Sequence, residues 1–172
     1  MKTDVDISTA SGDDDALTAL VQVIQDSPPY DYRPGEVAAA AEWFPPLVER
    51  ATHAYVARRA EEPVGFLVAL PISTYGKVDD YEAALGVDFA TTTYLAELGV
   101  ASSARRIGLA STLVERLHAE LPETTTACVV RTLEWNAPAI ALYERHGYEL
   151  ADGVTQEWNG RTRVFLTRRF AR

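Results

Sequence analysis

Cysteine and histidine are scarce in this sequence. Its 172 residues include one cysteine, Cys128, and three histidines, His53, His118 and His146. A single cysteine excludes an intrachain disulfide framework and fits a reducing compartment. Because Cys128 lies in an apolar segment, we expect a buried small side chain rather than a reactive thiol. The histidines share no ligand spacing with one another, so no metal site is predicted.

Long apolar runs are also missing. The most apolar stretch, Val64 to Ile72, is far shorter than the ~20 residues of a membrane-spanning helix. Residues 1–6 have neither the basic run nor the apolar core of a signal peptide. No repeat, low-complexity tract or linker divides the chain. We therefore expect a single domain over residues 1–172, as a cytoplasmic monomer or homodimer without a membrane partner.

The net charge of −9 is unevenly distributed. Residues 1–100 contain 6 Lys+Arg and 17 Asp+Glu, whereas residues 101–172 contain 10 and 8. This pattern argues against nucleic acid as a partner, since nucleic acid requires a continuous basic face. It favours an anionic cofactor beside the basic half and a cationic acceptor beside the acidic half. The alternative is that the acidic surface only keeps the protein soluble.

Periodicity predicts an α/β chain. The helix expected over residues 36–42 should stop before Pro45-Pro46 and resume up to about residue 50. Prolines exclude a helix from residues 27–35. Residues 71–92 read as an excursion with a short helix near 81–85. Strands are expected over 5–10, 53–60, 64–70, 94–100, 125–131, 148–150 and 162–168, and helices from the acids at 13–15 to about 25 and over 36–42, 109–121 and 136–147.

The stretch after the fourth of these strands has the features of an anion site. A polar loop, residues 101–104, is followed by Arg105-Arg106-Ile107-Gly108-Leu109-Ala110 and then by a helix with leucine at every fourth position. The first-turn amides of a helix have no intrahelical partner, and the helix dipole adds about half a positive charge there. Small residues let a phosphate approach the backbone, and arginines donate to its oxygens.

The spacing Arg105-x-x-Gly108-x-Ala110 resembles the R/Q-x-x-G-x-G/A signature of the GNAT superfamily of acyl-CoA-dependent N-acyltransferases. A second block, Asn136-x-x-Ala139-x-x-x-Tyr143-x-x-x-Gly147-Tyr148, is similar to another motif of that family. The resemblance implies a mixed, mostly antiparallel sheet of six to seven strands, splayed at its centre and flanked by about four helices. The loop at 101–104 lacks the family's usual proline and acid, and Ala110 replaces the commoner glycine, which predicts a modestly weaker phosphate approach.

The resemblance also implies acetyl-CoA as co-substrate and no metal. The pyrophosphate would lie on the amides from Arg105 to Ala110, and the pantetheine arm would pair with the strand before them, whose amide would also polarise the thioester oxygen. Gly99 marks a close approach on that strand or, alternatively, tight packing. The implied cofactor-binding residues are Leu98, Gly99, Val100, Arg105, Arg106, Ile107, Gly108, Leu109, Ala110, Ser111, Asn136 and Tyr143.

Two residues are expected to act as catalysts. The resemblance makes Glu97 the base that deprotonates the amine; the alternatives are a carboxylate that only binds the ammonium, or a solvated strand residue, with Asp88 and Glu134 next in line. Tyr143 would protonate the leaving thiolate, unless it is a core residue. Asn136 would bond the pantetheine region or, equally, cap its helix.

The predicted function is therefore transfer of an acetyl group to a primary amine of a small molecule or a protein. The alternative is a non-catalytic acyl-CoA-binding sensor, which would need the arginines but neither catalyst. Neither G-x-x-x-x-G-K-[S/T] nor G-x-G-x-x-G occurs after an early strand, which disfavours another nucleotide-binding class. The acceptor site is expected to include Tyr30, Tyr32, Trp43, Tyr75 and Asp88.

Overall fold

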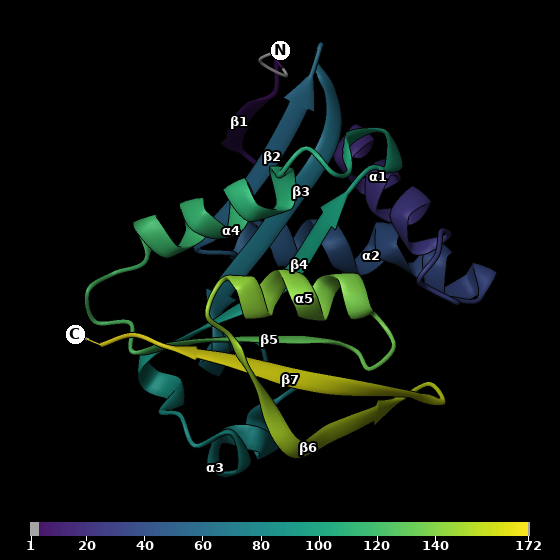
Figure 1. The fold of residues 1–172 in the computed structure, drawn as a ribbon. Coiled ribbons are helices and arrows are strands. Elements are labelled where there is room, and N and C mark those ends of the chain that lie inside the picture. The colour runs from purple at the N-terminus through teal and green to yellow at the C-terminus, as the bar shows by residue number, and fades with distance from the viewer. Residues whose placement is uncertain (1–3, 172) are drawn as a thin grey trace. The chain divides into compact units, whose positions relative to one another are not determined.

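Seven strands form one open sheet in the order β1-β2-β3-β4-β5-β7-β6. It is seen in the computed structural model of this chain, which describes residues 4–171 (Figure 1). Strands β1–β2, β5–β7 and β6–β7 pair antiparallel, and β4–β5 pair parallel. The strands are β1 Asp6–Thr9, β2 His53–Arg59, β3 Glu62–Pro71, β4 Thr92–Val100, β5 Ala127–Leu133, β6 Glu149–Trp158 and β7 Arg161–Arg169.

The described residues also form five α-helices and four short 3-10 helices. The predicted class, a mixed and mostly antiparallel sheet with flanking helices, is therefore confirmed. The helices are α1 Asp15–Gln25, α2 Pro34–Arg50, α3 Glu82–Leu85, α4 Leu109–Glu120 and α5 Ala137–Arg145, and the 3-10 helices are η1 Ile72–Thr74, η2 Asp79–Tyr81, η3 Phe89–Thr91 and η4 Ser102–Ala104.

The chain forms two compact units. Unit 1 comprises Met1–Val68 and Glu97–Val114, and unit 2 comprises Ala69–Ala96 and Glu115–Arg172. Strands β3 and β4 and helix α4 contribute residues to both units. Met1, Lys2, Thr3 and Arg172 lie outside the described residues. The expectation of one domain over residues 1–172 stays a prediction.

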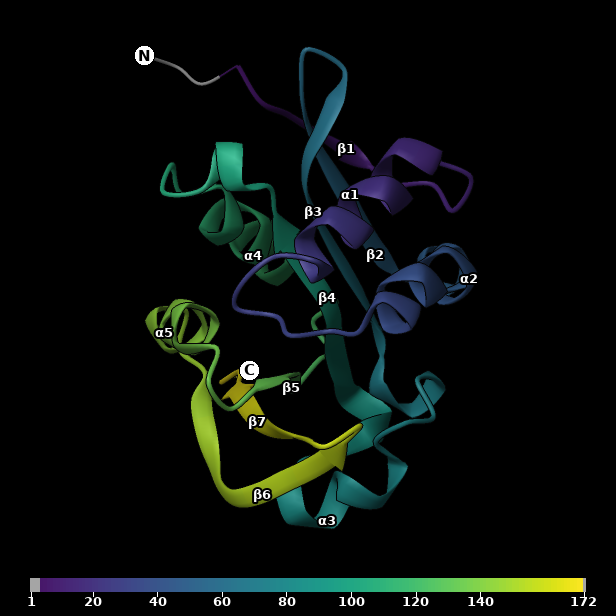
Figure 2. The ribbon, with the colours of Figure 1, turned by 90° about the vertical axis from the view of Figure 1, so that its right-hand side faces the viewer.

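In unit 1 helices cover both faces of the strands (Figure 2). On one face, the ring of Phe44 from α2 lies 5.4 Å from the ring of Phe66 on β3, in an edge-on arrangement. On the other face, Leu109 at the start of α4 packs where Gly65 leaves room. All three large side chains are buried. This packing holds the end of β4 and the start of α4 against β3.

Helix α2 differs from the prediction, because it runs unbroken through Pro45 and Pro46. An interior proline costs about 3 kcal/mol through its missing amide and its ring. The carbonyls that lose their donors belong to residues 41 and 42, which are exposed, so water can bond them. The buried stripe Ala40, Phe44, Leu47 and Val48 holds the helix together. Pro34 at the first turn needs no amide partner, so the helix also begins inside the segment expected to be loop.

In unit 2, β4 pairs with β5 from Thr92↔Ala127 to Leu95↔Val130, and β7 pairs along the whole of β5. The predicted hairpin at Asn159-Gly160 is confirmed, with φ values of 49° and 77° that suit a tight turn. Strand β6 is longer than the expected 148–150, because it continues past a register shift between Leu150 and Thr155. The excursion from β3 to β4 folds into η1, η2, α3 and η3. No helix within residues 4–171 has both the length and the apolar character needed to cross a membrane.

Candidate functional site

The loop between β4 and α4 is anchored at its start and left open at its end. The Ala101 amide donates to the Val64 carbonyl at 2.9 Å, and the side chain of Ala104, the last residue of η4, is fully buried. Beyond this anchor, Arg106 and Gly108 both have left-handed backbone angles, with φ of 63° and 83°. A left-handed arginine is unusual and costs energy, whereas glycine adopts this conformation freely. The loop therefore turns sharply just before the helix.

The mouth of α4 is not filled by side chains. A Cβ built on Gly108 meets no atom within 4 Å. The first helical hydrogen bond runs from the Thr112 amide to the Gly108 carbonyl at 3.0 Å. The amides of Leu109 and Ala110 therefore have no carbonyl within the helix to bond. With the partial positive charge of the helix end, this turn is suited to an anion.

Arginines surround this turn. Arg105 and Arg106 are exposed, and the Arg105 Nε donates back to the Val100 carbonyl at 3.3 Å. A third arginine, Arg59 at the end of β2, donates from Nη1 to the Ser103 carbonyl at 3.4 Å. Sequence reasoning missed Arg59, because it precedes the loop by 44 residues and no local pattern marks it. The loop thus has three cationic side chains rather than two.

The strand before the loop holds the predicted thioester-binding residues. Glu97, Leu98 and Val100 are half-buried, whereas Gly99 is buried. A Cβ built on Gly99 would lie 2.6 and 2.8 Å from two atoms of the Phe66 ring and 3.0 Å from Ile24. Of the two interpretations of Gly99, this geometry favours packing: the glycine makes room for a core ring.

Three of the predicted acceptor residues belong to unit 1. The rings of Tyr30 and Tyr32 lie 5.2 Å apart, and the Trp43 ring lies 5.9 Å from that of Phe44. All three are half-buried, so each still presents a surface to a ligand. Unit 1 therefore contains the anion turn, the segment Glu97 to Val100, Ser111 and these aromatic residues.

Unit 2 holds the remaining predicted residues. Asn136 is buried, and its Oδ1 accepts the Ala139 amide at 3.3 Å, so it is the N-cap of α5. Tyr143, also buried, follows two turns later on that helix, and its ring lies 5.5 Å from that of Tyr148. Both readings of Asn136 stay open, because the cap uses its oxygen and not its amide nitrogen. The placement of Tyr143 as a buried helix residue is equally consistent with a core role and with an acid.

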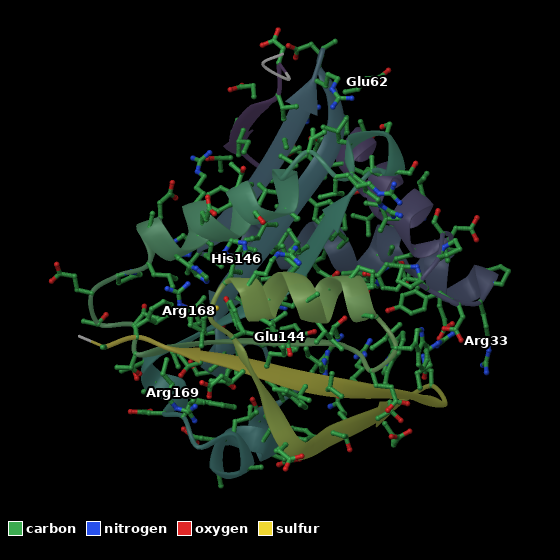
Figure 3. The ribbon with its side chains drawn as sticks, in the orientation of Figure 1. Arg33, Glu62, Glu144, His146, Arg168 and Arg169 are labelled. Atoms are coloured by element: carbon green, nitrogen blue, oxygen red, sulfur yellow. The ribbon has the colours of Figure 1, made fainter. Side chains whose placement is uncertain are left out.

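A part-buried chain of polar side chains lies beside Tyr143. Arg168 donates from Nη1 to the His118 Nδ1 at 2.7 Å and to the His146 carbonyl at 2.8 Å; Figure 3 labels Arg168 and His146 near the end of α5. Because a guanidinium only donates, neutral His118 has its proton on Nε2 and donates to the Tyr148 hydroxyl at 2.8 Å. The Tyr148 hydroxyl is thus occupied.

Burial sets the protonation states in this chain. Desolvation, with the positive charge of Arg168, lowers the pKa of His118 to about 4, so the ring is neutral at pH 7. Burial raises the pKa of the Cys128 thiol to about 11 and raises that of Tyr148 as well. The expectation that Cys128 is a buried small side chain is confirmed, and its raised pKa disfavours a reactive thiolate.

The other residues considered for catalysis or acceptor binding have local structural partners. The Asp88 carboxylate accepts the Ala90 amide at 2.9 Å as the N-cap of η3. The Tyr75 hydroxyl accepts from Arg131 at 3.3 Å, and its ring lies 4.5 Å from that of Tyr94. Glu134 is exposed. In the part of the chain that the structure describes, no group of three or more His, Cys, Asp or Glu side chains could hold a metal ion.

Comparison with known proteins agrees with this architecture. Among solved structures, the fold is similar to PH1933 from Pyrococcus horikoshii OT3, with a TM-score of 0.73 and 19% identity over 98% of this chain and 99% of that one. It is also similar to the PaiA N-acetyltransferase from Thermoplasma acidophilum in complex with coenzyme A, with a TM-score of 0.71 and 12% identity over 96% and 99%.

A GNAT family acetyltransferase from Elizabethkingia anophelis with acetyl-CoA bound gives a TM-score of 0.64 and 16% identity over 98% and 100%. These likenesses show the fold. No curated protein matches the sequence. The family model described as "Acetyltransferase (GNAT) family" matches residues 17–148. The chain belongs to the acetyltransferase (GNAT) family.

Proposed function

We propose that this protein is an N-acetyltransferase that uses acetyl-CoA to acetylate a primary amine of a small molecule or a protein. The observation that carries the proposal is the open turn at Gly108, with unbonded first-turn amides at Leu109 and Ala110 and arginines beside it. A diphosphate fits such a turn, since it has charge for the helix end and oxygens for the amides and guanidinium groups. Membership of the family and relatives crystallised with acetyl-CoA or coenzyme A support the same reading.

Most of the residues that would hold acetyl-CoA lie in the segment from Leu98 to Ser111. Arg105 to Ala110 would bind the pyrophosphate, Ser111 would add a hydroxyl, and Arg59 would supply a further positive charge. The main chain of Leu98 to Val100 would pair with the pantetheine arm and donate an amide to the thioester oxygen. Asn136 would use its amide nitrogen toward the same arm while its oxygen caps α5.

The reaction requires two proton transfers. The amine must be deprotonated, because an alkylammonium with a pKa of about 10.4 has no lone pair at neutral pH. Glu97 would accept that proton, directly or through water, as the nitrogen forms a bond to the carbonyl carbon. As the carbon–sulfur bond breaks, Tyr143 would donate a proton to the thiolate. Positioning of the two reactants supplies a large part of the acceleration.

The acceptor is an amine, and two features support a protonated one. The first hundred residues are strongly acidic, and a carboxylate at Glu97 would attract an ammonium. Aromatic rings at Tyr30, Tyr32 and Trp43 would contribute apolar and cation–π contacts. Location in a reducing compartment such as the cytoplasm stays a prediction that depends on the single cysteine.

A screen of amines with acetyl-CoA, followed by thiol release, tests the proposal. We expect saturable acetyl-CoA binding, and turnover that falls at least tenfold in Glu97→Gln and in Tyr143→Phe without loss of binding. Tyr148→Phe is the matched control for the second substitution, because the Tyr148 hydroxyl is already bonded to His118. Binding at micromolar concentration without any thiol release would support the acyl-CoA sensor instead. Absence of binding at tens of micromolar would refute both.

A further inference from the structure

The hairpin between β2 and β3 ends in a strained turn. Only Ala60 and Glu61 separate the two strands, and both have left-handed backbone angles, with φ of 48° and 70°. A two-residue turn of this kind normally uses asparagine and glycine, because other side chains are disfavoured in that conformation. Arg58 stabilises the turn: its Nη1 donates to the Glu61 carbonyl at 2.8 Å, and its Nη2 is paired with Asp14, the N-cap of α1. The end of β2 is therefore held in one conformation.

Arg58 and its neighbour Arg59 point to opposite faces of the hairpin. Side chains of consecutive strand residues alternate between the two faces of a sheet. Arg58 bonds Asp14 at the start of α1, whereas the Arg59 Nη1 donates to the Ser103 carbonyl in the loop before α4. Figure 2 shows α1 and the start of α4 on opposite sides of these strands, and all of these residues belong to unit 1. Arg59 therefore lies on the face that carries the open turn at Gly108.

The arginines around this loop, Arg59, Arg105 and Arg106, have no carboxylate partner. None of the three forms an ion pair with another of the described residues. Arg59 and Arg105 donate only to main-chain carbonyls, those of Ser103 and Val100. The acid at the start of β3, Glu62, which Figure 3 labels near the end of the hairpin, is exposed and pairs with none of them. The positive charge beside the loop is thus uncompensated.

Coenzyme A has two separate phosphate centres, and the cationic groups are divided in the same way. Its diphosphate is attached to C5′ of the ribose, and a phosphomonoester on C3′ adds a charge of about −1.5 to −2. The first-turn amides at Gly108, with Arg105 and Arg106 next to them in the chain, suit the diphosphate. Arg59 contacts the loop at Ser103, the opposite end from Gly108. It is therefore placed for the second centre, across the ribose from the first.

We propose that Arg59 binds the 3′-phosphate of coenzyme A, so that the hairpin between β2 and β3 makes the protein selective for coenzyme A over its 3′-dephospho form. This inference rests on the proposed use of acetyl-CoA and deepens it, because it assigns a specificity-determining residue outside the loop. A guanidinium donates two parallel bonds to a phosphate, and the bond to Ser103 occupies only one of the five donors of Arg59.

Binding of coenzyme A and of 3′-dephospho-coenzyme A tests the proposal, because the two ligands differ only in that phosphate. Isothermal titration of wild type should give a Kd for coenzyme A at least tenfold below that of the dephospho form. In Arg59→Gln the Kd of coenzyme A should rise about tenfold, as expected for loss of a charge-assisted hydrogen bond, while that of the dephospho form changes less than threefold. Arg59→Lys keeps the charge without the fork and should lie between wild type and Arg59→Gln.

Two further variants separate recognition of this phosphate from general charge effects. Arg116→Gln is the matched control: this arginine of α4 is also half-buried, but its Nε donates to Glu120 Oε1 at 2.8 Å, so its charge is compensated. It should leave both Kd values unchanged. Arg106→Gln should weaken both ligands by the same factor, because the diphosphate is common to them. Thermal melts of every variant report whether the fold is retained.

The outcomes distinguish this inference from the proposed function. Equal loss of affinity for the two ligands in Arg59→Gln would overturn the inference, because Arg59 would then serve the diphosphate or the loop. Wild-type Kd values that do not differ would also overturn it, and either result leaves the acetyltransferase intact. The titrations need no turnover, so they decide the role of Arg59 even where no amine releases thiol. Failure of wild type to bind either ligand would overturn the proposed function together with the inference.

Discussion

Substitution of Gly108 by alanine separates the strain of a backbone turn from its use by a ligand. Gly108 has a φ of 83°, and a Cβ added to it would meet no atom within 4 Å. An alanine at this position would therefore have room for its methyl group but would be strained by the left-handed backbone. A left-handed alanine costs roughly 1–2 kcal/mol. For a chain of this size, that loss lowers the melting temperature by about 2–8 °C.

Gly153 supplies a matched control. It has a φ of 71°, its built Cβ also meets nothing within 4 Å, and it lies on β6, far along the chain from the anion turn. Gly153→Ala should therefore lose about the same stability as Gly108→Ala. The two variants should differ only where a ligand approaches the backbone at residue 108.

Isothermal titration with coenzyme A measures that difference. A methyl group at the mouth of α4 would hold a phosphate away from the first-turn amides, and we expect Kd to rise at least tenfold, or about 1.4 kcal/mol. Gly153→Ala should bind as wild type does. Equal Kd values for the two variants and wild type would refute the assignment of the Gly108 turn to the diphosphate, whatever their melting temperatures.

Three further predictions concern stability and the cap of α5. Gly99→Ala should destabilise the fold by about 1–3 kcal/mol in denaturant titration, because its methyl group would lie 2.6 Å from the buried Phe66 ring; an unchanged midpoint would contradict this packing. The folded pKa of His118, about 4 against 6.5 when unfolded, means that the unfolded chain binds more protons between those values. Stability should therefore be complete above pH 6.5 and fall as the pH decreases toward 4, by about 2 kcal/mol after allowance for partial exposure; His118→Gln should flatten the pH profile of the melting temperature. Asn136→Asp should keep the cap on Ala139 and thus the melting temperature, whereas Asn136→Ala should lose about 1 kcal/mol; a raised KM for acetyl-CoA in the aspartate variant would assign the amide nitrogen to the pantetheine arm.

Local patterns predicted the parts of the fold that local interactions determine. The strand, loop and helix around Gly108 were readable because glycine, charge and leucine spacing all lie within one short segment. The hairpin at Asn159-Gly160 was readable for the same reason. The continuity of helix α2 could not be predicted in this way. The prolines that destabilise it, Pro45-Pro46, are visible in the sequence, whereas the packing that stabilises it, Phe44 on Phe66, involves a residue of another element.

The parts of the site that were missed depend on residues distant in the chain. Arg59 approaches the loop across 44 residues, Arg168 reaches His118 across 50, and Arg131 reaches the Tyr75 hydroxyl across 56. None of these arginines lies in a recognisable motif. A single sequence gives no reason to prefer them over the other arginines of the chain.

Net charge misleads about recognition when charges already have partners inside the fold. The acidic first hundred residues suggested a cationic acceptor, yet two of these acids have local partners: Glu82 accepts the Phe89 amide and Asp88 accepts the Ala90 amide. Asp14 is likewise paired with Arg58. Arg59 is the opposite case: it adds a single charge to the total, but its partner in the described chain is a neutral carbonyl. A charge without a counter-charge interacts strongly with a ligand, whereas a compensated one contributes little beyond its partner.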